Sequence, residues 1–396
     1  MSTPATGQPL PERADVVVVG GGVMGASIAF HLAEAGVRDV LLLERDQLAA
    51  GSTSRCAGGV RAQFSDPVNV ALGARGLDAF EAFAARPGQQ IDLHQPGYLF
   101  VVTDPDDVPV FTESVALQNR MGVPSRVLTP EQAAARSPGI VTDDVLMATF
   151  HARDGYCSPE SVVLGYATAA RRHGATIRTR VEVTGIEVSG GDVTAVRTTA
   201  GTVRTPTVVC AVGAWAQPLA AGVGVHLPVT PVRRQILVTE PLGEHVTEQL
   251  PASMPMTIDA TTTFYVHREG PAALLGMSYA AEEPGEKLSY SEAWLPDLMD
   301  AVERRCPVLG EVGMAQHWAG LYEVTPDHNA LIGESGTVSR FLYATGFSGH
   351  GFLQGPAVGE VIRDLYLDRP PVVDVTCLSA DRFAVPARDR PERNIV

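Results

Sequence analysis

Three glycines and one carboxylate near the start of the chain have the types and the spacing that bind a dinucleotide. Gly20, Gly22 and Gly25 form the pattern G-x-G-x-x-G, and Glu44 follows them. In this pattern the first glycine permits a tight turn, the second lets a pyrophosphate approach the backbone, and the third lets a helix pack closely on a strand. A carboxylate at Glu44 can accept both hydroxyl groups of a ribose and repels a 2′-phosphate, which disfavours NADP.

A strand, a helix and a second strand must hold these residues in place. Residues 15–19 are an almost wholly β-branched apolar run, which predicts a strand buried on both faces. Residues 22–35 carry apolar side chains at near-helical spacing and stop at Gly36, and residues 40–43 predict a second buried strand. The helix N-terminus presents unpaired N–H groups and the positive end of its dipole to the phosphates. We therefore expect an α/β fold that begins with a Rossmann-like dinucleotide site.

Size and charge narrow the class of protein and its partners. The chain has 396 residues, of which 45% are hydrophobic and 19% are charged, and this length suits two domains. Its formal net charge of −15 argues against nucleic acid and against an anionic membrane as partners. No apolar run reaches the roughly 18 residues that span a bilayer. The polar N-terminus lacks the apolar core of a signal peptide, so we expect a loose tail there and no membrane span.

Cysteine and histidine usage indicates a reduced compartment and no metal chemistry. The five cysteines are scattered along the chain without a C-x-x-C pair, which favours a cytoplasmic setting. The ten histidines show neither H-x-x-x-H nor H-E-x-x-H spacing, so we expect no catalytic metal.

Two further glycine-rich stretches lie far along the chain and extend the predicted ligand site. A buried strand within TVVCAVGAWA runs into Gly213, and such a strand end suits a place beside the first strand. A helix predicted over residues 351–367 begins amid glycines, directly after His350. It presents a second helix N-terminus to a ligand.

The positions of these stretches predict a two-domain protein with a mixed or antiparallel sheet in the second domain. Strands and helices alternate around the glycine motifs, whereas the parts between them are dominated by short strands. The cofactor-binding domain is expected to be discontinuous and to comprise residues 1–90, 150–225 and 320–396. The substrate-binding domain is expected to comprise residues 91–149 and 226–319.

Several motifs, in the same order along nearly the whole chain, resemble those of the D-amino-acid-oxidase-type flavoproteins. That family includes sarcosine oxidases, dimethylglycine dehydrogenases and glycine oxidases. The motifs are the opening stretch, DGYCSPE with GATI, VVCAVGAWA, TPDHNALIG and GFSGHGF. The stretch GSTSRCAGGVRAQFSDPVNV is closer still to the β subunits of L-proline dehydrogenase and heteromeric sarcosine oxidase. The resemblance implies FAD as cofactor and oxidation of a C–N bond of a secondary amine or amino acid to an imine, by hydride transfer to flavin N5.

The resemblance also implies which residues contact FAD. The motif glycines hold the pyrophosphate, Glu44 the adenosine ribose, Val183 the adenine side and Gly213 the edge of the isoalloxazine ring. The helix that begins near Gly351 points its positive end at the part of the flavin where negative charge develops on reduction. The complete set of expected FAD contacts is Gly20, Gly22, Val23, Met24, Gly25, Glu44, Arg45, Gly51, Ser52, Thr53, Ser54, Arg55, Val183, Gly213, Gly346, Gly349, His350, Gly351 and Phe352.

The chain departs from the family at three positions. Gly320 stands where monomeric sarcosine oxidases have the cysteine that links the flavin, and the attachment histidine of dimethylglycine dehydrogenases is also missing, so we expect non-covalent FAD. Leu274 falls near the lysine that activates oxygen in those oxidases, which leaves O2 or another electron acceptor open. Leu353 stands in place of a lysine that binds the substrate carboxylate.

Arg61, Tyr265 and His350 are predicted to act on the substrate. The resemblance places Arg61 at the remaining carboxylate-binding arginine, and a guanidinium can grip a carboxylate with two hydrogen bonds. The alternative is an arginine that bonds a loop carbonyl. Tyr265 has a family precedent, and His267 shares its face on a regular strand, so both or neither should face the flavin. His350 is either a flavin or substrate neighbour or a histidine with a structural bond at a helix start.

Other chemically interesting residues are interpreted as structural. Tyr322 and Asp327 are expected to pack and to cap a turn. Cys56 is expected to be buried and not to act as a nucleophile. Met254 and Met256 are expected in the core.

The same motifs leave other functions open. One is oxidation of a primary D-amino acid or of glycine. Another is a β-type subunit of a hetero-oligomeric dehydrogenase, or a non-catalytic flavin-binding assembly factor. A third is biosynthetic oxidation of a larger amine, for which the lysine missing at Leu353 leaves room. We expect a small-molecule amine or amino-acid substrate, and both homo-oligomers and hetero-oligomers remain open.

Overall fold

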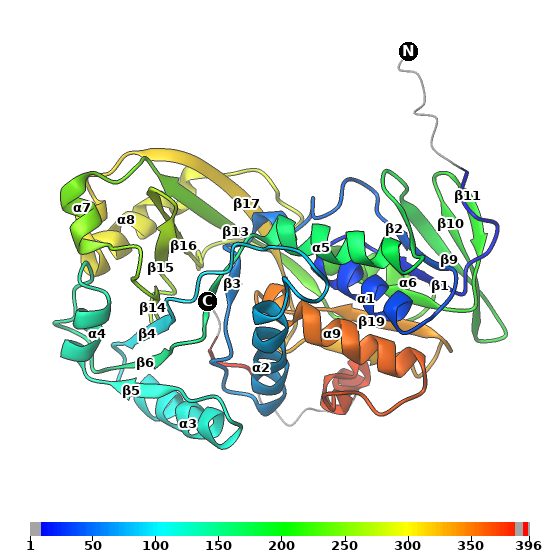
Figure 1. Cartoon of the computed structure of the whole chain (residues 1–396), viewed down its shortest axis with the longest axis horizontal. Coiled ribbons are helices and arrows are strands. Elements are labelled where there is room, and N and C mark those ends of the chain that lie inside the picture. The colour runs from blue at the N-terminus through cyan, green and yellow to red at the C-terminus, as the bar shows by residue number, and fades with distance from the viewer. Residues whose placement is uncertain (1–8, 385–390, 395–396) are drawn as a thin grey trace, which may run out of the picture.

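The computed structural model describes residues 9–384 and 391–394, so the predicted tail at residues 1–8 lies outside the described part. Figure 1 shows two lobes side by side, with helix α2 (Pro67–Glu81) and strand β3 (Gly59–Val60) between them. One lobe is built on a six-stranded sheet and the other on an eight-stranded sheet.

The six-stranded sheet has the opening βαβ unit at its centre. β1 pairs in parallel with β2 on one side and with β12 on the other, and α1 (Val23–Glu34) connects β1 to β2. The edge strand β18 runs antiparallel to its neighbour β19. This arrangement confirms the expected α/β fold with a Rossmann-like unit. The order across the sheet is β18 (Leu331–Glu334), β19 (Phe341–Thr345), β12 (Val208–Cys210), β1 (Val16–Val19), β2 (Val40–Leu43) and β8 (Thr176–Arg178).

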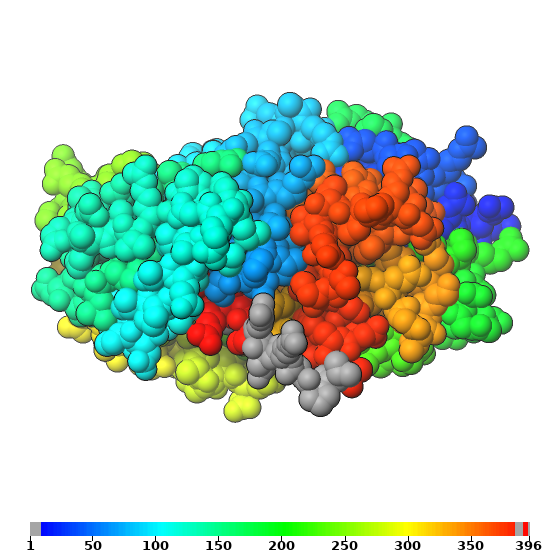
Figure 2. Space-filling view, turned by 90° about the horizontal axis from the view of Figure 1, so that it is seen from below, coloured from blue at the N-terminus to red at the C-terminus, as the bar shows by residue number. Residues whose placement is uncertain are grey.

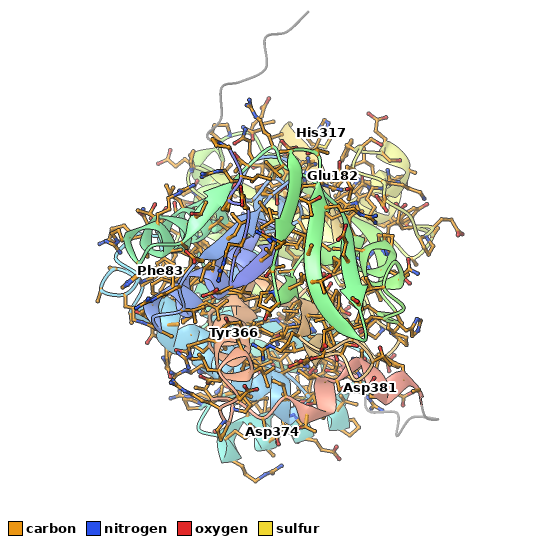
Figure 3. The ribbon with its side chains drawn as sticks, turned by 90° about the vertical axis from the view of Figure 1, so that its right-hand side faces the viewer. Phe83, Glu182, His317, Tyr366, Asp374 and Asp381 are labelled. Atoms are coloured by element: carbon orange, nitrogen blue, oxygen red, sulfur yellow. The ribbon has the colours of Figure 1, made fainter. Side chains whose placement is uncertain are left out.

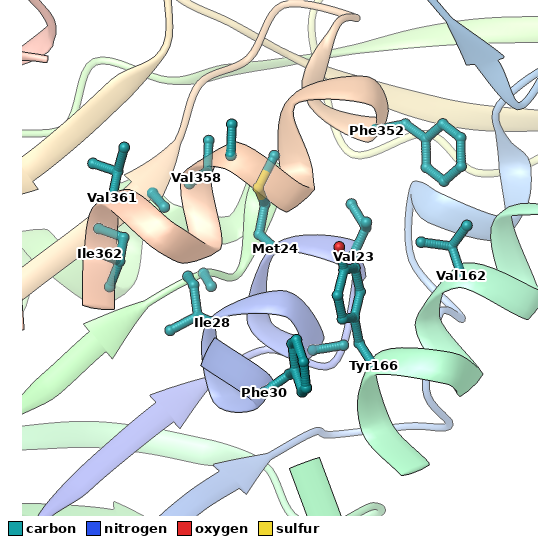
Figure 4. Packing of buried hydrophobic residues seen from close by; sticks show 14 of the residues in the cluster. Val23, Met24, Ile28, Phe30, Val162, Tyr166, Phe352, Val358, Val361 and Ile362 are labelled. Atoms are coloured by element: carbon teal, nitrogen blue, oxygen red, sulfur yellow. The ribbon is translucent and has the colours of Figure 1, made fainter. Parts of the chain in front are cut away.

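Both faces of this sheet are covered, which explains why β1 is apolar at every position. Val16 and Val18 belong to a core cluster with helices α1, α5 and α9, whose packing Figure 4 shows. Val17 and Val19 belong to a second cluster with the three-stranded sheet and helix α6. Successive side chains of a strand point to opposite faces, so a strand between two layers is apolar throughout. The covering elements are α5 (Pro159–Arg172), α9 (Gly351–Tyr366), α6 (Ala216–Ala221), β9 (Val183–Ser189), β10 (Asp192–Thr198) and β11 (Gly201–Arg204).

The three-stranded sheet of β9, β10 and β11 lies on the outer side of this lobe. Figure 3 shows its strands facing the viewer, with Glu182 at one end, directly before β9. β10 pairs antiparallel with both neighbours. The first residue of β9, Val183, is half-buried.

The eight-stranded sheet is mixed, as the sequence predicted. All of its strand pairs are antiparallel except the pair of β14 and β4. One of its faces packs on helix α8 (Leu295–Arg305), and the other faces the first lobe. The order across the sheet is β17 (Met314–Val324), β13 (Thr230–Thr239), β16 (Ala272–Met277), β15 (Tyr265–Glu269), β14 (Met256–Asp259), β4 (Tyr98–Val102), β6 (Met147–His151) and β5 (Arg126–Leu128).

The remaining elements connect and cover these sheets. Strand β7 pairs with β3 in a two-stranded ribbon between the lobes. Within the described ranges, no helix combines the length and the apolar character needed to cross a bilayer. The remaining elements are α3 (Asp107–Arg120), α4 (Pro130–Arg136), α7 (Glu244–Gln249), β7 (Gly155–Tyr156) and the 3-10 turns η1 (Thr53–Arg55), η2 (Gly213–Trp215), η3 (Glu292–Trp294), η4 (Pro307–Leu309), η5 (Thr376–Leu378) and η6 (Ala380–Ala384).

The domain boundaries remain a prediction. Six strands of the eight-stranded sheet lie within the two segments assigned to the substrate-binding domain. β6 crosses the predicted boundary between residues 149 and 150, and β17 crosses the one between residues 319 and 320. The long strands β13 and β17 pair along their whole length and reach from the second lobe toward the first (Figure 1).

Helices α1 and α9 pack closely because glycines on α9 leave room for side chains of α1. A Cβ at Gly355 would lie 2.8 Å from the side chain of Val23, and a Cβ at Gly359 would lie 2.2 Å from Ser27 Oγ. His31 Nδ1 donates a hydrogen bond to the carbonyl oxygen of Ser27 at 2.8 Å. Burial lowers the pKa of His31 to about 3, so its imidazole is neutral in this contact.

Gly359→Ala tests this packing. In an open helix the change from glycine to alanine stabilises by roughly 0.5–1 kcal/mol. Here the new methyl group must displace α1, because the backbone carbonyl carbon of Ser27 would lie 3.0 Å from it. We expect a loss of about 1–3 kcal/mol and a lower melting temperature. Gly243→Ala is the control, since nothing lies within 4 Å of a Cβ there and φ is −64°. Equal melting temperatures of the two variants would show that the contact between α1 and α9 does not require glycine at position 359.

Candidate active site

A cavity of about 710 Å³ lies between the two lobes. Its walls come from the carboxyl ends of β1 and β2, the segment after β12, the start of α9 and one face of the eight-stranded sheet. In an open α/β sheet, ligands bind outside the carboxyl ends of the strands, where neighbouring crossovers diverge. The predicted residues that line the cavity are Gly20, Gly22, Val23, Met24, Glu44, Arg45, Gly51, Ser52, Thr53, Arg55, Arg61, Val183, Gly213, Tyr265, Gly349, His350, Gly351 and Phe352.

The turn between β1 and α1 has no room for side chains. Gly20 has a φ of +108°, and a Cβ there would lie 2.3 Å from the carbonyl oxygen of Ala211. A Cβ at Gly25 would lie 1.8 Å from the carbonyl oxygen of Gly20. A Cβ at Gly22 would lie 3.1 Å from Thr53 Oγ1. Gly20 therefore lets the segment after β12 approach the turn, Gly22 leaves room for Thr53, and Gly25 lets the helix pack against the turn.

The N-terminus of α1 is open to an anionic group. Its N-cap residue, Gly22, offers no side chain to cap the helix, and the first turn carries no acidic residue. Thr53 Oγ1 accepts a hydrogen bond from the backbone N–H of Val23 at 3.1 Å, which holds the following loop against the helix start. The helix dipole and the glycines of this turn together form a cradle that suits a pyrophosphate.

Glu44 stands at the end of β2 with its carboxylate oriented by two backbone N–H groups. Oε2 accepts from Gly21 at 2.6 Å, and Oε1 accepts from Asp46 at 2.8 Å. Each carboxylate oxygen can accept a second hydrogen bond, which suits a ribose hydroxyl. Beside it, the guanidinium carbon of Arg45 lies 4.1 Å from the ring centre of Trp215, and both residues line this end of the cavity.

Gly25, Ser54 and Gly346 are not among the residues that line the cavity. The backbone N–H of Ser54 bonds to the carbonyl oxygen of Ala49 within the loop after β2. A Cβ at Gly346 would lie 2.5 Å from the side chain of Thr325, on the far side of the wall. The structure therefore does not bring these three residues together with the other predicted contacts. They pack against residues next to the cavity without lining it.

The opposite wall is one face of the eight-stranded sheet. Tyr265 on β15 pairs across the sheet with Gly276 on β16, and Gly276 pairs with Ile236 on β13. Directly opposed residues of neighbouring strands point to the same face. Gly276 makes room for the phenol, since a Cβ there would lie 2.3 Å from the Tyr265 oxygen. The side chains of this wall that line the cavity are Tyr98, Arg234, Ile236, Met256, Ile258, Tyr265 and Tyr322.

The three tyrosines of this wall are neutral phenols. Burial raises the pKa of Tyr98, Tyr265 and Tyr322 above the ordinary value. A neutral phenol can donate a hydrogen bond and also pack its ring against alkyl groups. The wall therefore suits a small ligand that has both polar and apolar parts.

His267 does not line the cavity, although it is two residues from Tyr265 on the same strand. Its ring centre lies 4.3 Å from that of Tyr156, and its Nδ1 donates to the carbonyl oxygen of Arg268 at 2.8 Å. Burial lowers its pKa to about 4. The expectation that both or neither of the pair would face the ligand is wrong, because Tyr156 on β7 covers His267 and leaves Tyr265 open.

Arg61 lines the cavity, but its terminal nitrogens are engaged. Nη2 donates to the carbonyl oxygen of Asn394 at 2.6 Å, and Nη1 donates to that of Gln63. The guanidinium carbon lies 4.1 Å from the ring centre of Phe64. These bonds match the alternative of an arginine bonded to loop carbonyls. They also fix the C-terminal segment 391–394, which Figure 2 shows in red beside the cyan segment of α3.

His350 precedes α9 and lines the cavity. Its Nε2 donates to the carbonyl oxygen of His328 at 3.0 Å, since a carbonyl oxygen only accepts. Nδ1 is then the acceptor of the ring, and it is buried without a partner among the described residues. Burial lowers the pKa of His350 to about 4, so the ring is neutral near pH 7. His350 thus has both a structural bond and a place in the wall.

Glu323 is a cavity residue that sequence reasoning missed. It follows Tyr322 on β17, and its Oε2 accepts a hydrogen bond from Thr345 Oγ1 at 2.9 Å. A Cβ at Gly213 would lie 3.4 Å from the same oxygen. Burial raises its pKa to about 7, although the backbone N–H groups of Gly346 and Phe347 favour the charged form. The available signal was Glu323 itself, the one charged residue in the largely apolar run of residues 318–324, because carboxylates are rare in buried strands.

Several residues interpreted as structural also line the cavity. Met254 and Met256 belong to the core, as expected, and Met256 also lines the cavity. Tyr322 packs against Arg234 and lines the cavity as well. Cys56 also lines it, and burial raises the pKa of its thiol to about 12, so it is not a thiolate nucleophile. Asp327 does hold a turn, since it accepts from the backbone N–H of Asn329 at 3.1 Å. Among the described residues, no group of three or more histidine, cysteine or acidic side chains could hold a metal ion.

Glu323→Gln should remove a loss of stability at high pH. Because the folded-state pKa of Glu323 is raised from 4.5 to about 7, its contribution to stability is fully present below pH 4.5 and is lost as the pH rises through 7. The wild-type protein should therefore lose up to about 3 kcal/mol between pH 5 and pH 8 that the variant keeps. Urea unfolding of both proteins without added ligand, at several pH values, measures this difference. Parallel pH profiles would contradict it.

Known proteins resemble this chain along nearly its whole length. The family model for FAD dependent oxidoreductases matches residues 15–365. The structure of L-proline dehydrogenase from P. horikoshii is 30% identical, with a TM-score of 0.88, and the match covers 95% of this chain and 99% of that one. The structure of glycine oxidase from Geobacillus kaustophilus is 25% identical, with a TM-score of 0.81, and the match covers 93% of this chain and 98% of that one.

One curated relative is about twice as long as the part that matches this chain. Mitochondrial dimethylglycine dehydrogenase of Mus musculus is 27% identical over 402 residues, which cover 96% of this chain and 45% of that protein. The chain therefore spans about half the length of the curated relatives it matches. The family model, the fold and the dinucleotide cradle agree, so the chain belongs to the family of FAD-dependent oxidoreductases, and FAD is its cofactor.

Proposed function

We propose that this chain oxidises a C–N bond of a secondary amine or amino acid to an imine, with FAD as the hydride acceptor. The observation that carries this proposal is the continuity of the cavity. It joins the cradle at Gly20, Gly22 and Glu44 to the wall that bears Tyr265 and Tyr322. FAD supplies the two-electron chemistry when bound, and the protein supplies binding and orientation.

The residues of the cradle fit FAD. The motif glycines leave no Cβ in the path of a pyrophosphate, and the uncapped start of α1 suits its charge. Glu44 suits the adenosine ribose, and Val183, at the start of β9, suits the adenine side. We propose that the predicted contacts that line the cavity hold the cofactor, with Gly213 and the start of α9 at the flavin end.

FAD attachment is proposed to be non-covalent. Gly320 on β17 provides no thiol, and a Cβ there would lie 2.9 Å from the Cβ of Arg55. Arg55 is held in this position because its Nη1 donates to the carbonyl oxygen of Ala319 at 2.9 Å. Cys56, which follows Arg55 and lines the cavity, is kept as a thiol by burial, which raises its pKa.

The wall of the cavity favours an amine with alkyl substituents. Ile236, Met256 and Ile258 supply apolar surface between the phenols of Tyr98 and Tyr265. Two of the relatives described above are named for dimethylglycine and L-proline, whose nitrogens carry alkyl groups. Burial keeps the phenols of Tyr98 and Tyr265 neutral. An amine that binds in its neutral form needs no base from the wall, because it has no proton to lose before hydride transfer. Tyr265 is proposed to contact the substrate.

Oxidation of glycine or a primary D-amino acid is the second candidate, because a glycine oxidase has the same fold.

The electron acceptor is proposed to be O2 or another oxidant, since Leu274 offers no cation to the cavity. We also propose a cytoplasmic location, supported by the five free cysteine thiols. The relative from Mus musculus is by its name mitochondrial. A homo-oligomer or hetero-oligomer remains a prediction.

Anaerobic reduction of the FAD-loaded protein tests the proposed reaction. Sarcosine, dimethylglycine and proline should bleach the visible flavin absorbance, and glycine and D-alanine should do so more slowly, because their nitrogens lack the alkyl groups that the wall accommodates. Admission of air, or of a dye, then identifies the class of electron acceptor from the rate at which the absorbance returns. An unchanged spectrum with every alkylated amine would rule out this substrate class, and faster reduction by glycine would favour the second candidate.

Glu44→Gln should weaken FAD binding. The change removes the charge and one acceptor oxygen, and a hydrogen bond to a charged group contributes roughly 1.5–3 kcal/mol. We expect the dissociation constant of FAD to rise about tenfold to a hundredfold. Titration of the FAD-free protein, followed by flavin fluorescence, measures it. Glu187→Gln is the control, since Glu187 is exposed on β9 and does not line the cavity. Equal affinities of the two variants would show that Glu44 does not bind the ribose.

A further inference from the structure

The arginines that line the cavity near the second sheet differ in what already holds them. Arg61 donates through both terminal nitrogens to backbone carbonyl oxygens, and Arg55 donates through Nε and Nη1 to those of Ala50 and Ala319. Arg234 donates through Nη1 to the carbonyl oxygen of its neighbour Arg233 at 3.0 Å. Its Nε is buried without a partner in the described part of the chain. A buried donor without an acceptor is unfavourable, and a ligand that accepts from it removes that cost.

The sheet register places Arg234 on the cavity wall. Arg234 on β13 pairs with Gly320 on β17, and it is two residues from Ile236, which also lines the cavity. Gly320 has no side chain, and Arg55 lies against it, since a Cβ at Gly320 would lie 2.9 Å from the Cβ of Arg55. The guanidinium carbon lies 5.0 Å from the ring centre of Tyr322, which packs against it on one side.

The charge of Arg234 is not balanced by a neighbouring carboxylate. Its immediate neighbour Arg233 points to the opposite face and forms an ion pair with Glu282 at 2.7 Å. Glu282 also pairs with Lys287 at 3.1 Å, so its charge is shared between two cations. Within residues 9–384 and 391–394, no ion pair involves Arg234. Burial lowers its pKa from the ordinary value for arginine, while Tyr322, Glu282 and Tyr265 oppose that shift.

We propose that Arg234 binds the carboxylate of the substrate, and that this chain therefore selects amines that carry a carboxylate. This inference rests on the proposed function and names its substrate class as N-alkylated or cyclic amino acids. A planar guanidinium with open donors matches the two oxygens of a carboxylate. Arg61, which was predicted for this role, is then a positioning residue that holds the C-terminal segment through Asn394.

Binding of a non-oxidisable carboxylate to the FAD-loaded protein tests the proposal. The probe is cyclopentanecarboxylate, which has the ring and carboxylate of a cyclic amino acid but no nitrogen. Its neutral counterpart is cyclopentanecarboxamide. Dissociation constants follow from the change in flavin absorbance, or from calorimetry where the absorbance does not change. We expect the wild-type protein to bind the carboxylate at least tenfold more tightly than the carboxamide.

Variants at two adjacent arginines separate the anion site from a general effect of charge. Arg234→Gln should weaken carboxylate binding at least thirtyfold and remove the preference over the carboxamide, and Arg234→Lys should restore part of it. Arg233→Gln is the matched control on the opposite face. It should lower the melting temperature by removing the ion pair with Glu282, yet leave both dissociation constants unchanged. With an amino acid that reduces the flavin, Arg234→Gln should raise KM more than it lowers the limiting rate of reduction.

Three results would overturn the proposal. They are an unchanged carboxylate affinity in Arg234→Gln, a preference that is lost only in Arg61→Gln, and a loss of FAD from Arg234→Gln in place of a loss of carboxylate binding. The outcome is separable from that of the proposed reaction. If no amine reduces the wild-type flavin but the carboxylate preference still depends on Arg234, the anion site stands and the reaction fails. If amino acids reduce Arg234→Gln with an unchanged KM, the reaction stands and the anion site fails.

Discussion

The architecture depends on the close approach of helix α1 to the end of strand β1. A Cβ at Gly25 would lie 1.8 Å from the carbonyl oxygen of Gly20, and a Cβ at Gly20 would lie 2.3 Å from that of Ala211. Three segments therefore meet at one point with only backbone between them. Because the helix starts there, its positive end stays at the edge of the sheet where a ligand binds.

The turn between β1 and α1 also determines how the neighbouring elements of the first lobe are positioned. The hydrogen bond from Gly21 to Glu44 ties the end of β2 to the turn, and the bond from Val23 to Thr53 ties the next loop to the helix. α9 can then lie against α1, since Gly355 and Gly359 leave room for its side chains. The glycines of the motif thus serve the packing of the lobe as much as the binding of a phosphate.

Burial governs the electrostatics of the cavity. Burial is the largest cause of the shifted pKa of Tyr265, Glu323 and His350, and in each case it favours the neutral form. The charges that remain at the substrate end are guanidinium groups, which stay protonated at any pH of interest. In a cavity of low dielectric constant such charges act strongly on an anionic ligand. Hydride transfer suits this environment, because it needs orientation more than it needs acids and bases.

The cofactor end could be predicted from the sequence because its signals are local. The glycine motif, the two strands and Glu44 lie within one short stretch, and their order alone defines the βαβ unit. The three-residue strand β8 was not predicted, since so short a run has no clear period. Domain boundaries, location and oligomeric state remain predictions, because neither local patterns nor one isolated chain determines them.

The substrate end could not be predicted because it depends on pairings that are distant in the sequence. Tyr322 reaches the cavity through the register of β17 with β13, and His267 is covered by a strand that lies far earlier in the chain. Arg61 is engaged by Asn394, more than three hundred residues away. A single sequence shows the alternation of side chains along each strand, but it does not show which strand is the neighbour.

The side chain of Leu353 carries no charge, which is consistent with an anion site on the sheet and not on α9. Leu353 is 4% exposed, belongs to the core cluster that includes α1, α2 and α9, and also lines the cavity. Its carbonyl oxygen would lie 2.2 Å from a Cβ at Gly76, so α9 and α2 are in close contact there. Leucine at this position therefore supplies apolar surface and no charge to the cavity. Arg234 is carried by β13, whose backbone pairs with β17 at Gly320 and is held in the sheet. A cation carried by a strand orients its ligand more closely than one carried by a loop, because the strand backbone is fixed on both sides.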